Sequence, residues 1–511
     1  MSESEDKLHR LIHSLDKSEK GFIKKFAALH VKEDANGVRL FDIYNSVKIY
    51  NKGKIEKLVK KEKFANHLPK TKNYLFELIL KALRNYYSEK KEIYNLKTQI
   101  QNADILKDKG LYKEALSIIK RTKKIGLEKE IYYPLVEALI IERQIWPSYQ
   151  VNPQETAILS KLNREEEKHL KYMDEAIVFF TNACFKAFYF AHLMGRGDRQ
   201  VTLNNFDKLV NSADYQRLLF LSSKKVKTLH QTILTYHHYV KEEKDLFIRE
   251  AGVLLELCLN KNKRPYFSNE IIVGFFTNLG IAASRFFNKG LFVQCINGLK
   301  ELKEEITDPE NHAFILSESC LSDLTYTHQL FSGDFEEALK TCELHLKKEV
   351  IKDDGINDNL VGLYINKSLI HFMLEQFSDA IKALNAIELY TEKHTTPYVD
   401  SEFYLMKILS HLEMGNSEAA FYMAKSYKNF IEKESLNFFQ RKALVDIIVK
   451  NPMAEKREIA KLTVSKFKEE NIPTDKCWDQ YLLDINVWCQ CAIKNISIGQ
   501  EYKKEYRQLY Q

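Results

Sequence analysis

The chain has 511 residues, enough for several domains or for one extended repeat array, and 45% of its residues are hydrophobic and 29% charged. This balance excludes an intrinsically disordered chain. Only 17 glycines and 9 prolines are present, well below average usage. Because these residues end helices and form turns, their scarcity predicts mostly helix with short connections. It also leaves little material for the glycine-rich loops of nucleotide-binding enzymes.

The net charge of +7 is unevenly distributed, because lysine and arginine outnumber aspartate and glutamate in the first 100 residues whereas the remainder is nearly neutral. We therefore expect a basic helical head over residues 1–95. Its expected helices cover residues 17–30, with Ser18 as the N-cap, and then residues 38–50 and 55–64. A further helix is expected to begin at Pro69 and to continue unbroken to about Lys109.

A lysine-rich segment lies inside this head, between Lys48 and Lys72, with only Glu56 and Glu62 as acidic residues. Short helices with lysine on the exposed face can grip phosphate groups, so this segment is a candidate nucleic-acid interface. Little arginine accompanies the lysines, and arginine usually makes the base-reading contacts. A plain solvated face or a protein-docking face is the alternative. The candidate residues are Lys52, Lys54, Lys57, Lys60, Lys61, Lys70 and Lys72.

A short motif recurs after the head, and its clearest copy is "SGDFEEALKT" (residues 332–341). Related stretches are "KGLYKEALSI" (109–118), "KGLFVQCING" (289–298), "LEQFSDAIKA" (374–383) and "EMGNSEAAFY" (413–422). In the last four copies, the small residue near the centre recurs after 43, 42 and 40 residues. The wider gap between the first two copies predicts about three degenerate repeats, two of them near residues 194–209 and 241–257.

The motif has a structural explanation. Glycine accepts the left-handed conformation that ends one helix, and the acidic residue after it suits the start of the next. The small residue is expected where the two helices cross, because a larger side chain would push them apart. These small residues are Ala115, Cys295, Ala338, Ala380 and Ala420, and the matching positions twelve residues earlier are Ala103, Ala283, Tyr326, Ser368 and Ile408.

This pattern resembles the turn and second helix of the tetratricopeptide repeat, over residues 96–430 and most clearly in "GLYKEALSII" and "GDFEEALKTC". The resemblance implies an all-α superhelical solenoid of antiparallel helix hairpins with a concave binding surface. The period of 40–45 residues departs from that family's 34 and is closer to HEAT-type lengths. The family's tryptophan is also absent from these units.

The resemblance further implies a peptide groove lined by the first helix of each hairpin. Transferred residue by residue, the lining would include Asp323, Thr327, Asn366, Met373, Glu402 and Met406. Of the lysine and asparagine clamp that some members use for a carboxylate, only Asn366 is present here. Internal packing of these residues is the alternative.

Residues 431–511 are expected to form a C-terminal helical capping region, because a repeat array needs a terminal element with a polar outer face. The stretch "CWDQYLLDINVWCQCAIKNI" (residues 477–496) is apolar and the tail after it is charged.

The eight cysteines are scattered singly and lie mostly in apolar helical stretches, which favours free thiols in a reducing, cytoplasmic compartment. The N-terminal decapeptide is polar and shows no signal-peptide pattern. The most apolar helix, residues 176–194, contains Asn182, Lys186 and His192, so burial inside a protein is expected instead of membrane insertion.

Candidate catalytic and metal-binding residues are few. No GxxxxGK[ST], HExxH or GxSxG motif occurs. The stretch "GRGD" (195–198) contains the cell-adhesion tripeptide Arg-Gly-Asp but is interpreted as a loop between two helices. His9 and His13 are interpreted as part of a solvated helix face, because no third metal ligand accompanies them. His230 and His237 share a helix face, and Cys489 and Cys491 are expected in a core. No catalytic residue, metal or cofactor is therefore predicted.

Two hypotheses follow. The first is a non-enzymatic scaffold that binds a protein or peptide in the solenoid groove. The alternative is a regulator whose basic head binds DNA or RNA while the solenoid senses a partner. An enzyme is a third and weaker hypothesis, because no clustered acid–base set is visible.

Overall fold

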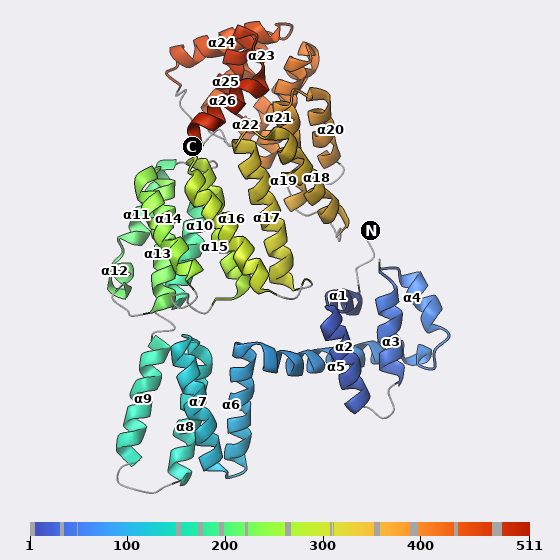
Figure 1. Ribbon diagram of the computed structural model, residues 1–511, viewed down its shortest axis with the longest axis vertical. Helices are drawn as coiled ribbons and strands as arrows, with labels where there is room; N and C mark the ends of the chain where they lie inside the picture. The colour runs from blue at the N-terminus through green and yellow to red at the C-terminus, as the bar shows by residue number, and fades with distance from the viewer. Residues whose placement is uncertain are drawn as a thin grey trace. The chain divides into compact units, whose positions relative to one another are not determined.

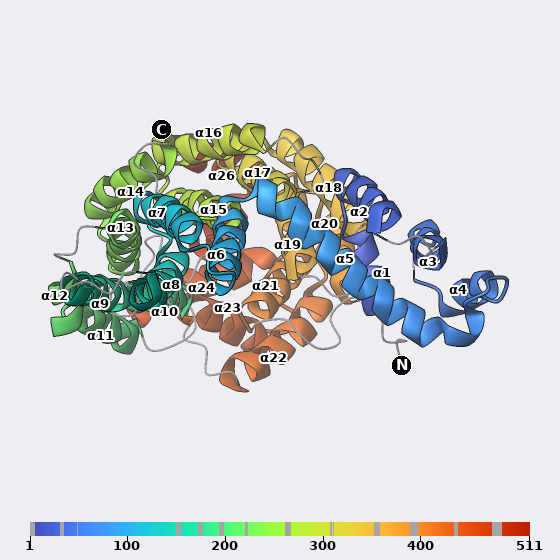
Figure 2. The ribbon, with the colours of Figure 1, turned by 90° about the horizontal axis from the view of Figure 1, so that it is seen from below.

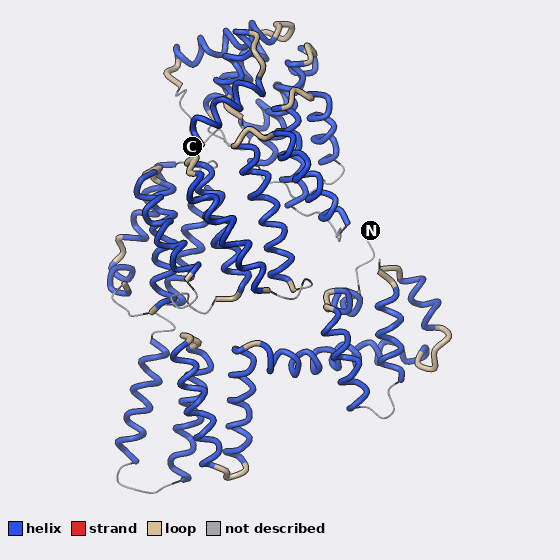
Figure 3. The backbone as a smooth tube through the Cα atoms, in the orientation of Figure 1, coloured by secondary structure: helices blue, strands red, loops and turns tan. Residues whose placement is uncertain are grey.

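In the computed structural model all regular secondary structure of the described residues is helical, with helices α1 to α26 and one short 3₁₀ helix joined by loops, and no strand is present among these residues (Figure 3). This confirms the predicted all-α fold class, with neighbouring helices packed in pairs. The structure describes residues 6–30, 35–48, 50–149, 155–171, 177–193, 199–219, 223–260, 267–306, 309, 311–351, 358–388, 397–433, 438–472 and 483–510.

The chain divides into two compact units. Unit 1 comprises residues 1–178 and 308–314, and unit 2 comprises residues 179–307 and 315–511 (Figure 1). Each unit is described by itself.

The head at the start of unit 1 has its own hydrophobic core, which includes Ile12, Leu40, Phe41 and Ile79. Helix α2 begins one residue before the predicted cap: Asp16 and Glu19, not Ser18, form a reciprocal capping box, with N···O distances of 2.8 and 2.6 Å. The elements of the head are α1 (Lys7–His13), α2 (Lys17–His30), α3 (Ala35–Ser46), α4 (Lys52–Val59), η1 (Ala65–His67) and α5 (Leu68–Lys90).

The prediction of one continuous helix from Pro69 to Lys109 is wrong, because the helix is interrupted at Lys91. Its φ of −114° and ψ of 122° are extended, so Lys91 ends α5 and precedes α6. The Asn95 side chain donates a hydrogen bond to the Ser88 carbonyl across the break, at 3.1 Å. No glycine or proline marks this position, so the sequence carried no breaking signal.

The rest of unit 1 consists of two helix hairpins, whose consecutive helices pack against one another. These helices are α6 (Glu92–Asp108), α7 (Tyr112–Glu128), α8 (Tyr132–Tyr149) and α9 (Glu155–Lys171).

Unit 2 continues the hairpin pattern (Figure 1). Its first helices are α10 (Phe179–Leu193), α11 (Arg199–Val210), α12 (Ala213–Leu218), α13 (Lys224–Val240), α14 (Lys244–Leu259), α15 (Asn269–Arg285), α16 (Lys289–Glu305) and α17 (His312–Phe331). They are followed by α18 (Phe335–Ile351), α19 (Asp358–Met373), α20 (Phe377–Glu388), α21 (Pro397–Glu413) and α22 (Ser417–Lys433).

One type of helix-ending connection, which we call a joint, follows α6, α7, α13, α15, α17, α19, α21 and α24 (Lys456–Glu469). At Gly333 φ is +75°, its N–H donates to the Leu330 carbonyl at 3.0 Å, and the N–H of Asp334 donates to the Gln329 carbonyl at 2.8 Å. This pair of bonds is a Schellman motif. The same bonds and a left-handed residue recur at Gly110, Glu130, Glu242, Phe287, Glu375, Gly415 and Asn471. The predicted glycine C-caps at Gly110, Gly333 and Gly415 are thus confirmed.

The small residues of the motif are buried, as predicted. Ala115, Ala338, Ala380 and Ala420 are 0% exposed. Their partners twelve residues earlier are also buried: Ala103, Ser368 and Ile408 are 0% and Tyr326 is 6% exposed. Each small side chain therefore lies inside the hairpin and not on its surface.

In the copy at residues 289–298 the joint lies three residues earlier than the sequence motif predicted. Its left-handed residue is Phe287, not Gly290, and Asn288 caps α16. The residue five positions after Phe287 is Phe292, which is 0% exposed, and twelve residues before it lies Gly280. A Cβ on Gly280 would lie 3.1 Å from a Leu324 methyl carbon. Here the small residue stands on the first helix and the large one on the second.

One of the two proposed degenerate repeats is present. Residues 241–257 form a joint at Glu242 followed by α14, and α13 packs on α14. The other proposed position includes residues 194–198, with the "GRGD" segment, which lie outside the described residues.

The C-terminal helices are α23 (Phe439–Lys450), α24 (Lys456–Glu469), α25 (Ile485–Lys494) and α26 (Ile498–Leu509). Their apolar residues share one core cluster with α17 to α22, including Trp488 and Cys489, both 0% exposed. The expected core location of Cys489 and Cys491 is confirmed.

The buried joint gives a first test. Ala338→Phe should lower the free energy of unfolding by roughly 1–3 kcal/mol, because the helix crossing has no room for a ring. Thermal unfolding followed by circular dichroism measures the change. Leu344→Phe on the same helix is the control, since Leu344 is 62% exposed. Equal unfolding temperatures for the two variants would contradict the assigned crossing.

Candidate binding surfaces

Part of the predicted lysine segment lies on α4, whereas Lys60 and Lys61 follow this helix and Lys70 and Lys72 lie on α5. Ile55 and Val59 are buried in the head core, and Lys57 lies on the opposite side of the helix. Lys54, Lys60 and Lys61 flank it and are exposed. Asn51 caps the helix by accepting a hydrogen bond from the Lys54 N–H at 2.8 Å. The helix therefore has a fixed apolar face and a fixed basic face.

Six of the seven candidate lysines are exposed and make no ion pair with the described residues: Lys52, Lys54, Lys57, Lys60, Lys61 and Lys70. We call these six residues the lysine face. Of the two acidic residues nearby, Glu62 pairs with Arg39 at 3.5 Å, and Glu56 is exposed. The lysine face thus carries positive charge that the surrounding structure does not neutralise.

Lys72 has a different environment. Its ammonium forms an ion pair with the Asp6 carboxylate, which also accepts a hydrogen bond from the Tyr44 hydroxyl at 2.9 Å and caps α1. Burial alone would raise the pKa of Asp6, but the hydrogen bonds from Lys72, the Leu8 N–H and Tyr44 outweigh it and hold this pKa below its usual value. Lys72 therefore helps to fix α1 within the head.

The sequence suggested a solvated helix face for His9 and His13, but in the structure both rings are packed against α3. Their Nε2 atoms lie 2.6 Å from the Val47 carbonyl oxygen and 3.0 Å from the Tyr44 carbonyl oxygen, at the end of α3. His9 is 3% exposed. His230 likewise lies against the Tyr215 hydroxyl, at 2.7 Å. These imidazoles act as hydrogen-bonding parts of the packing.

The predicted groove residues fall into two groups. Asp323, Thr327 and Asn366 are partly exposed on α17 and α19. Asp323 lies 3.2 Å from the buried His345 ring, and the Asn366 amide donates a hydrogen bond to the Tyr326 hydroxyl at 2.5 Å. The last bond joins the first helices of two successive hairpins.

Met373, Glu402 and Met406 are instead buried, at 1%, 2% and 1% exposure. The C-terminal helices cover this part of the array. Arg441 of α23, itself 1% exposed, forms an ion pair with Glu402 at 2.5 Å. One face of α21 is thus closed by the chain itself, and the role of these three residues in binding stays a prediction that their burial argues against.

The C-terminal end of α21 is also contacted by the C-terminal helices, through Glu413. Glu413 accepts a hydrogen bond from the Trp488 indole N–H at 2.8 Å and pairs with Lys456 at 2.6 Å. Because one carboxylate holds both α24 and α25, these helices are fixed to the repeat array.

Helix α26 contacts the joints of three hairpins, which the sequence did not indicate, and it lies next to α16 and α17 (Figures 1 and 2). Its start lies at the joint of Glu375, which accepts a hydrogen bond from the Ser497 hydroxyl at 2.5 Å. Lys503 packs on Gly333, and the Tyr506 ring contacts Phe287 in a tilted arrangement and Phe331 edge-on. The tyrosines at 502, 506 and 510, spaced by four residues, were the available sequence signal.

Comparison of the sequence with known protein families finds no match, and no curated protein matches it either. None of the described helices combines the length and the hydrophobicity needed to cross a lipid bilayer.

The fit of α26 gives a second test. A Cβ on Gly499 would lie 2.1 Å from the Met373 carbonyl oxygen. Gly499→Ala should therefore force α26 away from its joint and lower the unfolding free energy by about 1–3 kcal/mol. Gly274→Ala is the control, because a Cβ there meets nothing within 4 Å. It should stabilise α15 by up to about 1 kcal/mol. Thermal unfolding of both variants measures these changes. A Gly499→Ala protein as stable as the wild type would refute the close contact between α26 and the Met373 carbonyl.

Proposed function

We propose that the chain is a non-enzymatic scaffold of tetratricopeptide-like, lengthened hairpins that binds another protein or a peptide. The observation that supports it most is the contrast along the first helices. Asp323, Thr327 and Asn366 stay partly exposed on two successive hairpins, whereas the corresponding face of α21 is covered by the chain's own helices. An exposed polar surface fixed by hydrogen bonds to its neighbours is suited to recognition.

A cytoplasmic location belongs to the same proposal. Its support is that the seven described cysteines are free thiols and six of them are buried. The absence of a catalytic role rests on the sequence alone, which has none of the nucleophile or metal motifs searched for.

Site-specific photo-crosslinking tests the scaffold. A photoreactive residue at Asp323 or Asn366 of the full chain should yield a crosslink to one defined partner in cells. The same residue at Tyr422, which is 58% exposed on the second helix α22, serves as the control. The purified partner should then bind the wild type and bind Asp323→Lys at least about tenfold more weakly, since a charge reversal at a contact costs more than about 1.4 kcal/mol. Equal crosslinking at all three positions would refute the groove.

A second candidate function is favoured by the lysine face. Six exposed lysines without ion pairs can neutralise phosphates and release counterions. Because lysine contacts backbone phosphates without reading bases, we propose binding to DNA or RNA with little sequence preference.

A salt series on the full chain tests this candidate. Affinity for a duplex should fall with salt, and Lys54→Gln, Lys57→Gln, Lys60→Gln and Lys61→Gln combined should flatten the slope by up to about four units. The matched control removes four other exposed lysines that make no ion pair, Lys425, Lys442, Lys461 and Lys468. A duplex affinity without salt dependence, or an equal loss in both variants, would contradict a role for the lysine face.

A further inference from the structure

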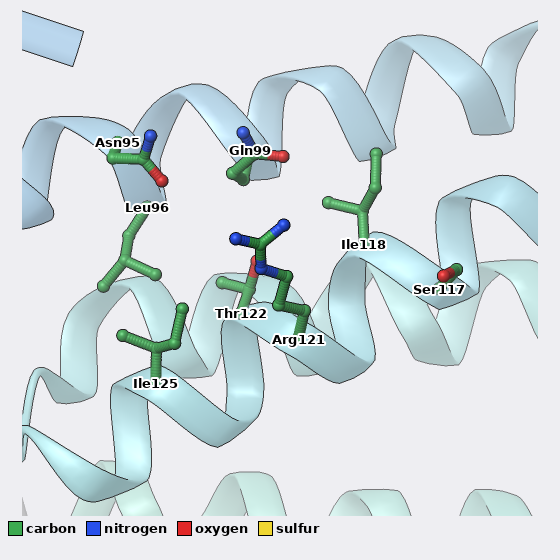
Figure 4. A pocket seen from close by; sticks show the side chains of 8 residues that line it. All are labelled: Asn95, Leu96, Gln99, Ser117, Ile118, Arg121, Thr122 and Ile125. Carbon is green, nitrogen blue, oxygen red and sulfur yellow. The ribbon is translucent and has the colours of Figure 1, made fainter. Parts of the chain in front are cut away.

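A small cavity of about 120 Å³ lies between α6 and α7 in unit 1. Its walls are Asn95, Leu96 and Gln99 from α6 and, from α7, Ser117, Ile118, Arg121, Thr122 and Ile125. Figure 4 shows the Arg121 guanidinium rising from α7 toward Gln99, with Asn95 one turn away on α6. The only charged group that lines the cavity is therefore a cation.

No described acidic group neutralises Arg121, which makes no ion pair or side-chain hydrogen bond with the described residues. The residues one turn away along α7 are Ser117, Ile118, Lys124 and Ile125, so no carboxylate stands at helical spacing. The acidic residues at the two ends of α6 are engaged elsewhere: Glu92 pairs with Lys129 at 3.5 Å, and Asp104 with Lys107 at 2.7 Å.

The wall opposite Arg121 is held in place. Asn95 donates its amide hydrogen bond to Ser88 across the break at Lys91, which fixes the first turn of α6. Leu96 is 1% and Thr122 2% exposed, so the floor belongs to the packed hairpin. The Gln99 amide has no hydrogen-bond partner among the described residues.

We propose that this cavity binds an oxyanion, a phosphate or a carboxylate, through Arg121. The guanidinium presents two parallel N–H donors that match two oxygens of such a group. The Gln99 amide and the Ser117 hydroxyl supply further donors, and Leu96, Ile118 and Ile125 form the apolar part of the wall, while Arg121 itself is exposed and can be reached from solvent. The site is independent of the lysine face and of the proposed scaffold groove, because it needs only a free oxyanion.

Ligand-observed NMR on the full chain tests the site with two probes, inorganic phosphate by its ³¹P linewidth and acetate by saturation transfer. Saturable binding should be abolished in Arg121→Gln. It should weaken about tenfold in Arg121→Lys, which keeps the charge and loses the paired donors. Arg84→Gln removes another exposed arginine that makes no ion pair and should leave binding unchanged. Circular dichroism confirms that each variant is folded.

The two probes distinguish the source of the oxyanion. Binding of phosphate alone assigns the cavity to phosphoryl groups, and binding of acetate alone assigns it to carboxylates. Gln99→Ala should weaken whichever ligand binds, since it removes the amide opposite Arg121. The proposal is overturned if neither probe shows saturable binding, or if Arg121→Gln and Arg84→Gln bind equally.

Discussion

One backbone device is common to the hairpins α6–α7, α13–α14, α15–α16, α17–α18, α19–α20 and α21–α22: a pair of hydrogen bonds closes the first helix around a residue in the left-handed conformation. The two bonds satisfy carbonyls that a helix end would otherwise leave unpaired, and they turn the chain so that the next helix begins two residues later. At Glu242, Phe287 and Glu375 a residue other than glycine adopts this conformation. The local cost of roughly 1–2 kcal/mol there is offset by the same two bonds.

This explains which parts of the fold could be predicted. Gly333 and Gly415 revealed their joints because glycine tolerates a positive φ. Glu242 and Glu375 did not stand out by residue type, and Gly290 misled by three residues because the joint itself is at Phe287. The helix break at Lys91 is marked by no glycine or proline in the sequence. Glycine therefore marked three joints directly, whereas the copies at 374–383 and 241–257 were found from the residues around the joint, and at 289–298 a glycine outside the joint gave the wrong position.

The candidate groove shows the same limit at longer range. Glu402, Met406 and Met373 lie on first helices, yet nothing near them in the sequence indicates what covers them. The cover comes from Arg441, 39 residues after Glu402, and from α26. A buried carboxylate must be paired to be tolerated, and its partner is found only when the chain has folded. The lysines of α4, in contrast, were predictable because their exposure follows from the local spacing of Ile55 and Val59.

Charge is used in two ways in this molecule, and the difference shows where binding is to be sought. Some charges are paired within the packed helices. Asp446 of α23 accepts hydrogen bonds from Lys428 of α22 at 2.8 Å and from Lys466 of α24 at 3.0 Å. Burial would raise the pKa of Asp446, but these bonds hold it below the usual value. The lysine face and Arg121 have no such partners among the described residues. A paired charge gains little from a ligand, since the existing pair must first be broken. An unpaired cation beside a fixed wall loses only water when an anion binds, and this is the physical reason why the two anion-binding proposals rest on the lysine face and on Arg121.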